Sequence, residues 1–208
     1  MTTRVLYLLG SAAPPVLNVA DVIRQAQEAG WEVCLGLTPT AARWLEDQLP
    51  DLVALTGYPV RSQYKMPGEP DVWPAAHVAL VAPATFNTIN QWALGLTNHF
   101  VVGFVAEAIG KGIPLAMMPC VNRAFAQHPQ FDLSVDTLRG TGVSVLYGES
   151  GFVPNEPGKG SPEGFPWDMA LSEAARLAEI VHGPVGGGDR ATRSVAVGRG
   201  QVRPPACP

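Results

Sequence analysis

Five short apolar runs, with helical patterns between them, constrain the fold of this chain more than any other feature of its sequence. The runs span residues 5–9, 32–37, 77–82, 114–118 and 143–147. Because they are apolar almost throughout rather than alternating, they predict strands that are buried on both faces of a sheet. Helices must then cover both faces. The pattern therefore predicts an α/β fold, a three-layer Rossmann- or flavodoxin-like sandwich around a parallel sheet.

Apolar residues at helical spacing predict the elements between and after these strands. The expected helices span residues 16–29, 41–48, 88–96, 100–109, 131–139 and 167–181. Thr38 is a candidate N-cap of the second helix, with Pro39 at its first position. Residues 57–75 and 148–166 are rich in glycine and proline and are predicted as loops.

The last part of the chain, residues 183–208, has a different composition. It combines glycine and proline with four arginines and one aspartate, which gives it a net charge of +3. Because the whole chain has a net charge of −4, residues 1–182 have a net charge of −7. Without hydrophobic periodicity such a segment buries too little surface to offset the entropy of ordering. We expect one domain over residues 1–182 and a flexible tail, either an unselected extension or a partner-binding arm.

Composition excludes several classes of protein. A net charge of −4, with only 15% charged residues, offers no general attraction for nucleic acid. No apolar run reaches the roughly 18 residues of a membrane span, and the run at 5–9 is too short for a signal peptide, so we expect a cytoplasmic protein. The cysteines, at positions 34, 120 and 207, form no metal or disulfide pattern.

The first two strand ends carry small and hydroxyl-bearing residues. Gly10, Ser11 and Ala12 follow the first strand, and Thr38 and Thr40 follow the second. Ligands of parallel α/β sheets bind beyond the carboxyl ends of the strands, where helix N-termini favour anions. These residues are therefore candidates for a phosphate site. An ordinary tight turn and helix capping are the alternatives.

The third and fourth strand ends share one order of residues. The third strand is predicted to stop at Pro83, and Thr85, Asn87 and Thr88 follow. The fourth ends in a proline that is soon followed by Asn122. These hydroxyls and amides are candidates for hydrogen bonds to a polar ligand. Alternatively, Asn87 and Thr88 cap the next helix.

Two of these segments resemble the motifs of a known family. Residues 83–88, PATFNT, resemble the PASANT motif of the homo-oligomeric flavin-containing cysteine decarboxylases, and residues 119–122, PCVN, resemble the start of their PxMNxxMW motif. The family includes phosphopantothenoylcysteine decarboxylase and the decarboxylases of lantibiotic peptides. The resemblance covers roughly residues 3–148 and implies FMN as cofactor.

The resemblance also implies roles for individual residues. Ser11 and Thr38, with backbone amides nearby, would hold the FMN phosphate, and Asn122 would bind a substrate carboxylate. The remaining implied cofactor residues are Gly10, Ala12, Thr40, Pro83, Ala84, Thr85, Asn87 and Thr88, the last four of which would contact the isoalloxazine and ribityl groups. The family places its flavin at a subunit interface, which implies a homotrimer or dodecamer and would explain the apolar helix at 100–109.

The catalytic residues depart from the family pattern. The family's histidine precedes PASANT by some 14 residues, a position that falls here on Glu69. The loop at 148–166 lacks the cysteine that the reductive enzymes use, and the MW pair of the second motif is FA. Glu69 or Asp71 could act as a base if desolvated, and His128 lies near the expected substrate end. Solvated loop residues are the alternative for each, and Cys120 is expected to be a packed thiol.

Two functions follow as expectations. The first is an FMN-dependent, oxidative decarboxylase-like enzyme that acts on a cysteine-containing small molecule or C-terminal peptide without a metal. The second is a non-catalytic flavin-binding regulatory or partner subunit. A flavin prenyltransferase is disfavoured because no basic cluster is present for an isoprenyl phosphate.

Overall fold

The computed structural model describes residues 4–148 and 151–182, so the predicted tail lies outside the described residues. Its centre is a sheet of five parallel strands in the order β2-β1-β3-β4-β5. The strands are β1 (Arg4–Gly10), β2 (Trp31–Leu37), β3 (Val78–Ala84), β4 (Leu115–Pro119) and β5 (Ser144–Val145). This is the flavodoxin-like strand order, so the predicted fold class is confirmed.

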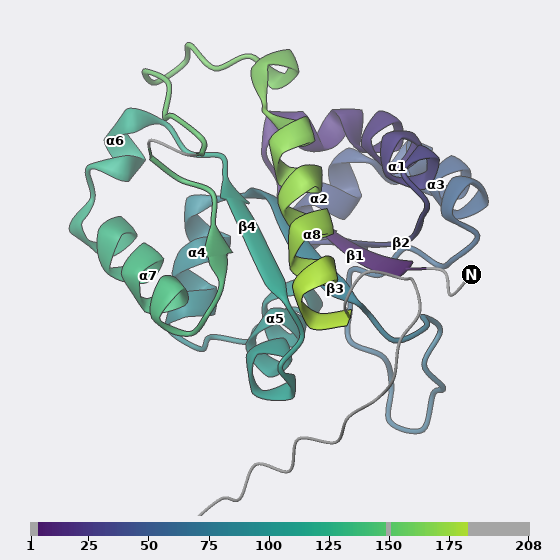
Figure 1. Ribbon diagram of the computed structural model, residues 1–208. Coiled ribbons are helices and arrows are strands. Elements are labelled where there is room, and N and C mark those ends of the chain that lie inside the picture. The colour runs from purple at the N-terminus through teal and green to yellow at the C-terminus, as the bar shows by residue number, and fades with distance from the viewer. Residues whose placement is uncertain (1–3, 149–150, 183–208) are drawn as a thin grey trace, which may run out of the picture.

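Helices cover both faces of the sheet. The α-helices are α1 (Val19–Glu28), α2 (Pro39–Trp44), α3 (Leu49–Thr56), α4 (Phe86–Ala93), α5 (Phe100–Lys111), α6 (Arg123–Ala126), α7 (Pro129–Gly140) and α8 (Trp167–His182). The 3-10 helices are η1 (Pro14–Asn18), η2 (Glu46–Gln48) and η3 (Pro162–Gly164). Helix α8 packs on β3 and β4 at the front of the view in Figure 1, and α5 contacts β2 and β4 from behind.

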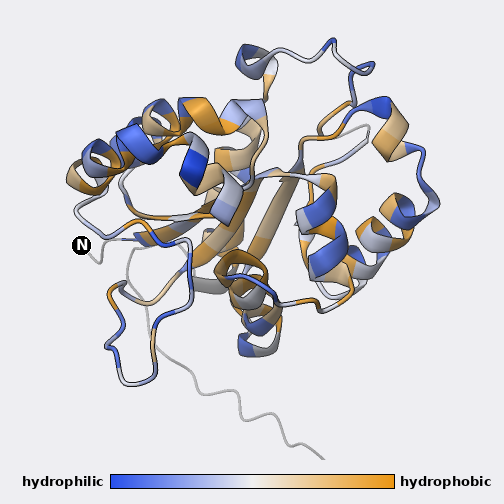
Figure 2. Ribbon diagram, turned by 180° about the vertical axis from the view of Figure 1, so that it is seen from behind, coloured by the Kyte–Doolittle hydropathy of each residue, from blue (hydrophilic) through white to orange (hydrophobic). Residues whose placement is uncertain are grey.

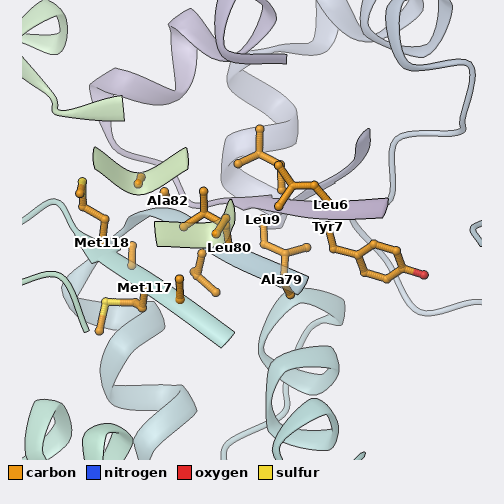
Figure 3. Packing of buried hydrophobic residues seen from close by; sticks show 14 of the residues in the cluster. Leu6, Tyr7, Leu9, Ala79, Leu80, Ala82, Met117 and Met118 are labelled. Carbon is orange, nitrogen blue, oxygen red and sulfur yellow. The ribbon is translucent and has the colours of Figure 1, made fainter. Parts of the chain in front are cut away.

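The core lies between these layers. Figure 3 shows the close packing of side chains from the three central strands, among them Leu6, Leu80 and Met117, each of which is fully buried. In Figure 2 the hydrophobic colour follows the strands and the inner faces of the helices, whereas the outer faces are hydrophilic. Burial on both sides explains why these strands show no alternation of apolar and polar residues.

The third strand does not stop where the sequence predicted. It runs through Pro83 to Ala84, with a cis Ala82–Pro83 peptide and a register shift against β4 between Val81 and Ala84. Pro83 has no N–H to offer, but its carbonyl accepts the N–H of Ser11 at 3.0 Å. The backbone at Pro83 thus stays hydrogen-bonded to the neighbouring β1 segment through its carbonyl oxygen, although it has no N–H to donate.

The following helix also begins earlier than predicted. Helix α4 starts at Phe86, two residues before the expected start, and Thr85 is its N-cap: its hydroxyl accepts the Thr88 N–H at 3.4 Å. The predicted capping by Asn87 and Thr88 is therefore wrong, because both lie inside the first helical turn. The predicted Thr38 cap of α2 is confirmed, since its hydroxyl accepts the Ala41 N–H.

Other boundaries shift for local reasons. The helix expected at 16–29 divides into η1 and α1, and the one expected at 41–48 divides into α2 and η2. The sequence reading missed α3, which carries Pro50 in its first turn, where no intrahelical N–H bond is needed. The apolar residues of α5 are largely buried within the chain itself, so its composition requires no subunit interface.

Candidate functional site

A cavity of about 770 Å³ lies at the carboxyl edge of the sheet. Its walls come from the segments that follow β1, β2, β3 and β4, and from the loop between β5 and α8. The strand order places the topological switch point between β1 and β3, where ligands of this fold class bind. The volume is within the roughly 300–1,000 Å³ range of small-molecule sites.

Most of the predicted binding residues line this cavity. They are Ala12, Thr38, Thr40, Thr85, Asn87, Thr88 and Asn122. The sheet topology brings them together because each follows the carboxyl end of a strand. Asn87, in the first turn of α4, is exposed, and its side chain has no hydrogen-bond partner among the described residues.

The other predicted cofactor residues, Gly10, Ser11, Pro83 and Ala84, are not among the residues that line it. Ser11 is fully buried, and its Oγ donates to Thr88 Oγ1 at 2.9 Å. A Cβ on Gly10 would come within 2.9 Å of Val16 Cγ2. Within this chain, Ser11 therefore supports the cavity wall from behind, through its bond to the lining residue Thr88.

Asn122 has a fixed side-chain orientation. Its Oδ1 accepts the Phe125 N–H at 3.0 Å and thereby caps α6. Because the oxygen of the carboxamide is used in this bond, the Nδ2 group is the end that is left for another partner. No residue in the described part of the chain accepts a hydrogen bond from Nδ2. Asn122 thus offers two N–H donors at the cavity, which suits a carboxylate.

The predicted acid–base candidates lie elsewhere in the chain. Glu69 is exposed, is not among the lining residues, and accepts the Met66 N–H at 2.8 Å. Asp71 forms a salt bridge with Lys65 at 2.5 Å, and this contact lowers the pKa of Asp71. His128 caps α7 through Nδ1, which accepts the Gln130 N–H at 3.1 Å. The structure of one chain does not bring these three to the cavity.

The sequence reading missed the aromatic walls. Phe86 and Phe125 line the cavity and stack with their ring centroids 4.9 Å apart. Phe152 and Phe165 line it from the loop after β5 and contact each other at 5.9 Å. The sequence did contain one sign of these walls, because Phe125 and Ala126 stand where the family's second motif has its MW pair.

The loop between β5 and α8 is anchored over the cavity. The Arg123 N–H donates to the Asn155 carbonyl at 2.8 Å, and the Arg123 guanidinium pairs with Glu156 at 3.0 Å. Asn155, Glu156 and Ser161 all line the cavity. The Gly/Pro-rich segment predicted as an ordinary loop is therefore part of the site.

Two titratable residues at the cavity have shifted pKa values. His99, at the start of α5, was not singled out from the sequence. Its Nδ1 is buried without a hydrogen-bond partner in the described structure, and burial lowers its pKa. Burial raises the pKa of Cys120 to about 11, so this thiol stays protonated at neutral pH, in keeping with a packed thiol.

Two other kinds of site are absent from the described ranges, 4–148 and 151–182. No group of three or more histidine, cysteine, aspartate or glutamate side chains there could hold a metal ion. No helix there is both long enough and apolar enough to span a bilayer. A second hollow, of about 780 Å³, lies between α5 and the loop before β3, where the Arg61 guanidinium sits 3.9 Å from the Phe100 ring centroid.

Solved structures share this fold. The FMN-dependent cysteine decarboxylase TvaF from thioviridamide biosynthesis is 19% identical over 84% of this chain and 98% of its own, with a TM-score of 0.64. The cypemycin decarboxylase CypD is 19% identical over 86% and 96%, with a TM-score of 0.66. The FMN-binding protein AtHal3 is 18% identical over 84% and 96%, with a TM-score of 0.60.

The comparison with family models decides the classification. No match was found among curated proteins. The Flavoprotein family model matches residues 2–183, which is most of the chain and includes every strand and helix described above. The family resemblance predicted from residues 83–88 and 119–122 is thus confirmed, and the chain belongs to the Flavoprotein family.

Proposed function

We propose that this protein binds FMN in the cavity at the carboxyl edge of the sheet. The observation that carries the proposal is the position of the cavity at the β1/β3 switch point, which is the FMN position of the flavodoxin-like strand order. Family membership and the FMN-dependent proteins among the structural neighbours support it.

The residues present fit the cofactor chemically. Thr38 and Thr40 offer hydroxyls for the phosphate, and the first turn of α4 also lines the cavity, through Phe86, Asn87 and Thr88. Phe86 and Phe125 provide a flat apolar wall for an aromatic ring system. His99 also lines the cavity. Hydroxyl groups suit the phosphate and ribityl oxygens of FMN, and aromatic faces suit its ring system.

We further propose an oxidative decarboxylase-like reaction on a cysteine-containing small molecule or C-terminal peptide. Bound FMN would supply an acceptor for two electrons. Two electrons and two protons would leave the substrate's CH₂–SH group to give a C=S group; one proton would leave with the electrons and the thiol proton would go to solvent. The bond to CO₂ then breaks, its electron pair moves toward sulfur, and the resulting enethiolate takes up one proton.

The chain's own contribution is to bind and orient the substrate. The Nδ2 group of Asn122 would donate to the substrate carboxylate before CO₂ is lost. Phe152 and Phe165, from the anchored loop, cover the cavity and exclude water. Exclusion of water favours loss of CO₂ because a carboxylate loses its hydration on entering an apolar site.

One observation favours a second candidate, a non-catalytic flavin-binding subunit. Glu69, at the position of the family histidine, is solvated and bonded within its own loop. Glu69 is not among the residues that line the cavity, so the sequence position of the family histidine supplies no base there within one described chain. A protein with an intact cofactor pocket and no such base fits a binding or regulatory role.

We also propose that the chain assembles as a homotrimer or dodecamer. The loop between α3 and β3 exposes three large apolar side chains, Tyr64, Met66 and Val72, beside the second hollow. Apolar side chains gathered on one exposed segment favour contact with another protein surface.

A flavin-bleaching experiment separates the two functions. FMN-loaded protein is mixed anaerobically with a peptide that ends in cysteine, and with the same peptide ending in serine. The enzyme proposal predicts loss of the oxidised flavin absorbance and release of CO₂ with the cysteine peptide only. A stable flavin spectrum with cysteine-ended peptides of varied sequence and with cysteine derivatives supports the non-catalytic subunit.

A further inference from the structure

The second hollow has charged walls as well as apolar ones. It is formed by α5 and the loop before β3, which lie side by side in Figure 1, and its volume of about 780 Å³ is within the range of small-molecule sites. Three cationic side chains and two carboxylates line it, which gives it a net charge of +1. Because residues 1–182 have a net charge of −7, the hollow is a positive region of a negatively charged domain.

One of these cations, Arg61, lacks a carboxylate partner. Lys65 pairs with Asp71 at 2.5 Å, and Lys111 pairs with Glu107 at 2.9 Å. The Arg61 guanidinium makes no ion pair and no hydrogen bond with any described residue. No nitrogen of Arg61 is among the buried side-chain atoms that lack a partner in the described chain, so its N–H groups are accessible from the hollow.

Backbone bonds and aromatic rings hold this guanidinium in place. The Arg61 N–H donates to the Leu35 carbonyl at 3.1 Å, and the Arg61 carbonyl accepts the Leu37 N–H at 2.8 Å, so the backbone is fixed to the edge of β2. The guanidinium carbon lies 3.9 Å from the Phe100 ring centroid and 5.3 Å from that of Trp73. Rings that stack on a guanidinium leave the N–H groups along its edge free, and these N–H groups match the two oxygens of a carboxylate.

An aromatic cluster lies beside the guanidinium in the same hollow. The Tyr7 ring contacts the rings of Trp73 and Phe104, with centroids 4.7 Å and 5.0 Å apart, and all three residues line the hollow. The Tyr7 hydroxyl donates to the Pro74 carbonyl at 2.7 Å, and Trp73 Nε1 donates to the Pro59 carbonyl at 2.9 Å. Because these polar ends already have partners, the cluster offers apolar ring surface to a ligand.

We propose that the second hollow binds a small organic carboxylate, whose carboxylate group pairs with the Arg61 guanidinium and whose apolar part packs against the aromatic cluster. The single excess positive charge favours a monoanion, which a carboxylate is at neutral pH, over a phosphate group with its charge of about −1.5 to −2. The site lies outside the cavity proposed for FMN and does not depend on flavin binding.

The test titrates full-length protein, labelled with ¹⁵N-tryptophan, with phenylacetate. Two further probes lack one half of the proposed ligand: 2-phenylethanol has no charge, and acetate has no ring. Phenylacetate should move the indole resonance of Trp73 but not that of Trp44, which lines neither cavity. The two incomplete probes should bind about tenfold more weakly or worse.

Substitution of the arginine should remove the site. Arg61→Leu should bind phenylacetate about tenfold more weakly or worse, because the charged hydrogen bonds to the carboxylate are lost. Arg4→Leu is the matched control: the Arg4 guanidinium also lies over a ring, 4.7 Å from the centroid of Trp31, but Arg4 does not line the hollow. Arg4→Leu should bind phenylacetate as wild type does.

Substitution of Asp71 should have the opposite effect. The contact with Lys65 chiefly, and also the charges of Arg61 and Lys111, lower the pKa of Asp71, so its carboxylate is ionised and repels a second anion in the hollow. Asp71→Asn should therefore bind phenylacetate about threefold more tightly, with a smaller gain at high salt. Asp21→Asn, which breaks an exposed pair with Arg24 away from the hollow, is the control and should change nothing.

The proposal is overturned if phenylacetate leaves the Trp73 resonance of wild type unmoved, or if 2-phenylethanol or Arg61→Leu binds equally well. Should Arg61→Leu fail to fold, Asp71→Asn decides, because the Asp71 side chain is 76% exposed. An unchanged affinity in that variant contradicts the site. If wild type does not bind phenylacetate and Arg61→Leu changes its mass in light scattering, the hollow is a contact between copies of the chain and the proposal is wrong.

Discussion

Ser11 Oγ donates a hydrogen bond to Thr88 Oγ1 at 2.9 Å, and both side chains are buried. The same Thr88 hydroxyl lies 3.1 Å from Thr85 Oγ1. This chain of hydroxyls joins the end of β1 to the first turn of α4, the two segments that flank the switch point. These three hydroxyl groups therefore hold the cavity wall in place. Thr85 and Thr88 line the cavity, whereas Ser11 lies behind it.

Removing this link should loosen the site. Ser11→Ala should lower the free energy of unfolding by about 1 kcal/mol, because one buried hydrogen bond is lost. It should also weaken FMN binding, because α4 loses its tether to β1. Ser134→Ala is the control, since Ser134 is equally buried but bonds to Gln130 on α7, away from the cavity.

Chemical denaturation and FMN titration of both variants check this prediction. Ser134→Ala should lose stability without losing FMN affinity. Equal FMN affinity in Ser11→Ala and wild type would show that the link does not shape the site.

A substitution should separate the roles of the two ends of the Asn122 carboxamide, the helix cap made by Oδ1 and the proposed substrate contact made by Nδ2. Asn122→Asp keeps an oxygen that can accept the Phe125 N–H, so the cap of α6 and the melting temperature should be nearly unchanged. It removes the Nδ2 donors and places a negative charge where the substrate carboxylate would bind. Turnover of a cysteine-ended peptide should therefore fall by more than about 100-fold.

Activity and FMN occupancy should be measured on the same Asn122→Asp sample. FMN occupancy should remain close to wild type. Full activity in this variant would remove Asn122 from the proposed substrate site.

The sequence was sufficient to predict the sheet and its ligand edge. Apolar runs without alternation identify strands buried on both faces, and the five predicted strands are the five observed. The residues after each strand, such as Thr38 and Asn122, could be grouped because parallel strands end at one edge. The ends of strands were less predictable where a proline was expected to end one. Strand β3 continues through Pro83, because the Pro83 carbonyl still accepts the Ser11 N–H.

Other parts of the site depend on tertiary contacts that no local pattern encodes. His99 precedes an apolar helix, and only the folded chain shows that its ring does not cap that helix. Phe152 and Phe165 belong to a Gly/Pro-rich segment whose path over the cavity depends on the Arg123–Asn155 hydrogen bond. Ser11 matches the family's phosphate residues by position, yet packing buries it behind the wall.

The thiol of Cys120 should react slowly with alkylating reagents. Its pKa of about 11 lies well above an ordinary thiol's roughly 8.5, so alkylation at pH 8 should be about 100-fold slower or more. The rate should rise about tenfold per pH unit up to that pKa, because only the thiolate reacts. Bound FMN should slow the reaction further, since Cys120 lines the cavity.

Labelling is followed by mass spectrometry in a Cys207→Ser background, which removes the cysteine outside the described residues. Cys34 is fully buried, and its pKa is raised to about 12, so it should remain unlabelled. Rapid labelling of Cys120 at pH 8 would contradict the packed-thiol assignment.

Assembly should depend on the loop before β3. Met66 and Val72 are 67% and 44% exposed, and charging both, as Met66→Asp with Val72→Asp, should shift the protein to smaller species in light scattering. Leu133→Asp on α7, where the side chain is 61% exposed, is the matched control and should leave the mass unchanged. A wild-type protein that is monomeric at all concentrations would contradict the proposed assembly.

The central claim is that this cavity holds FMN. The most direct measurement is the visible spectrum of full-length protein after incubation with FMN and removal of unbound cofactor. Wild type should retain one flavin per chain, whereas Asn87→Leu, which alters an exposed cavity side chain without a protein partner, should lose most of it. A colourless wild-type protein would contradict FMN binding, and full flavin occupancy in Asn87→Leu would contradict the assigned pocket.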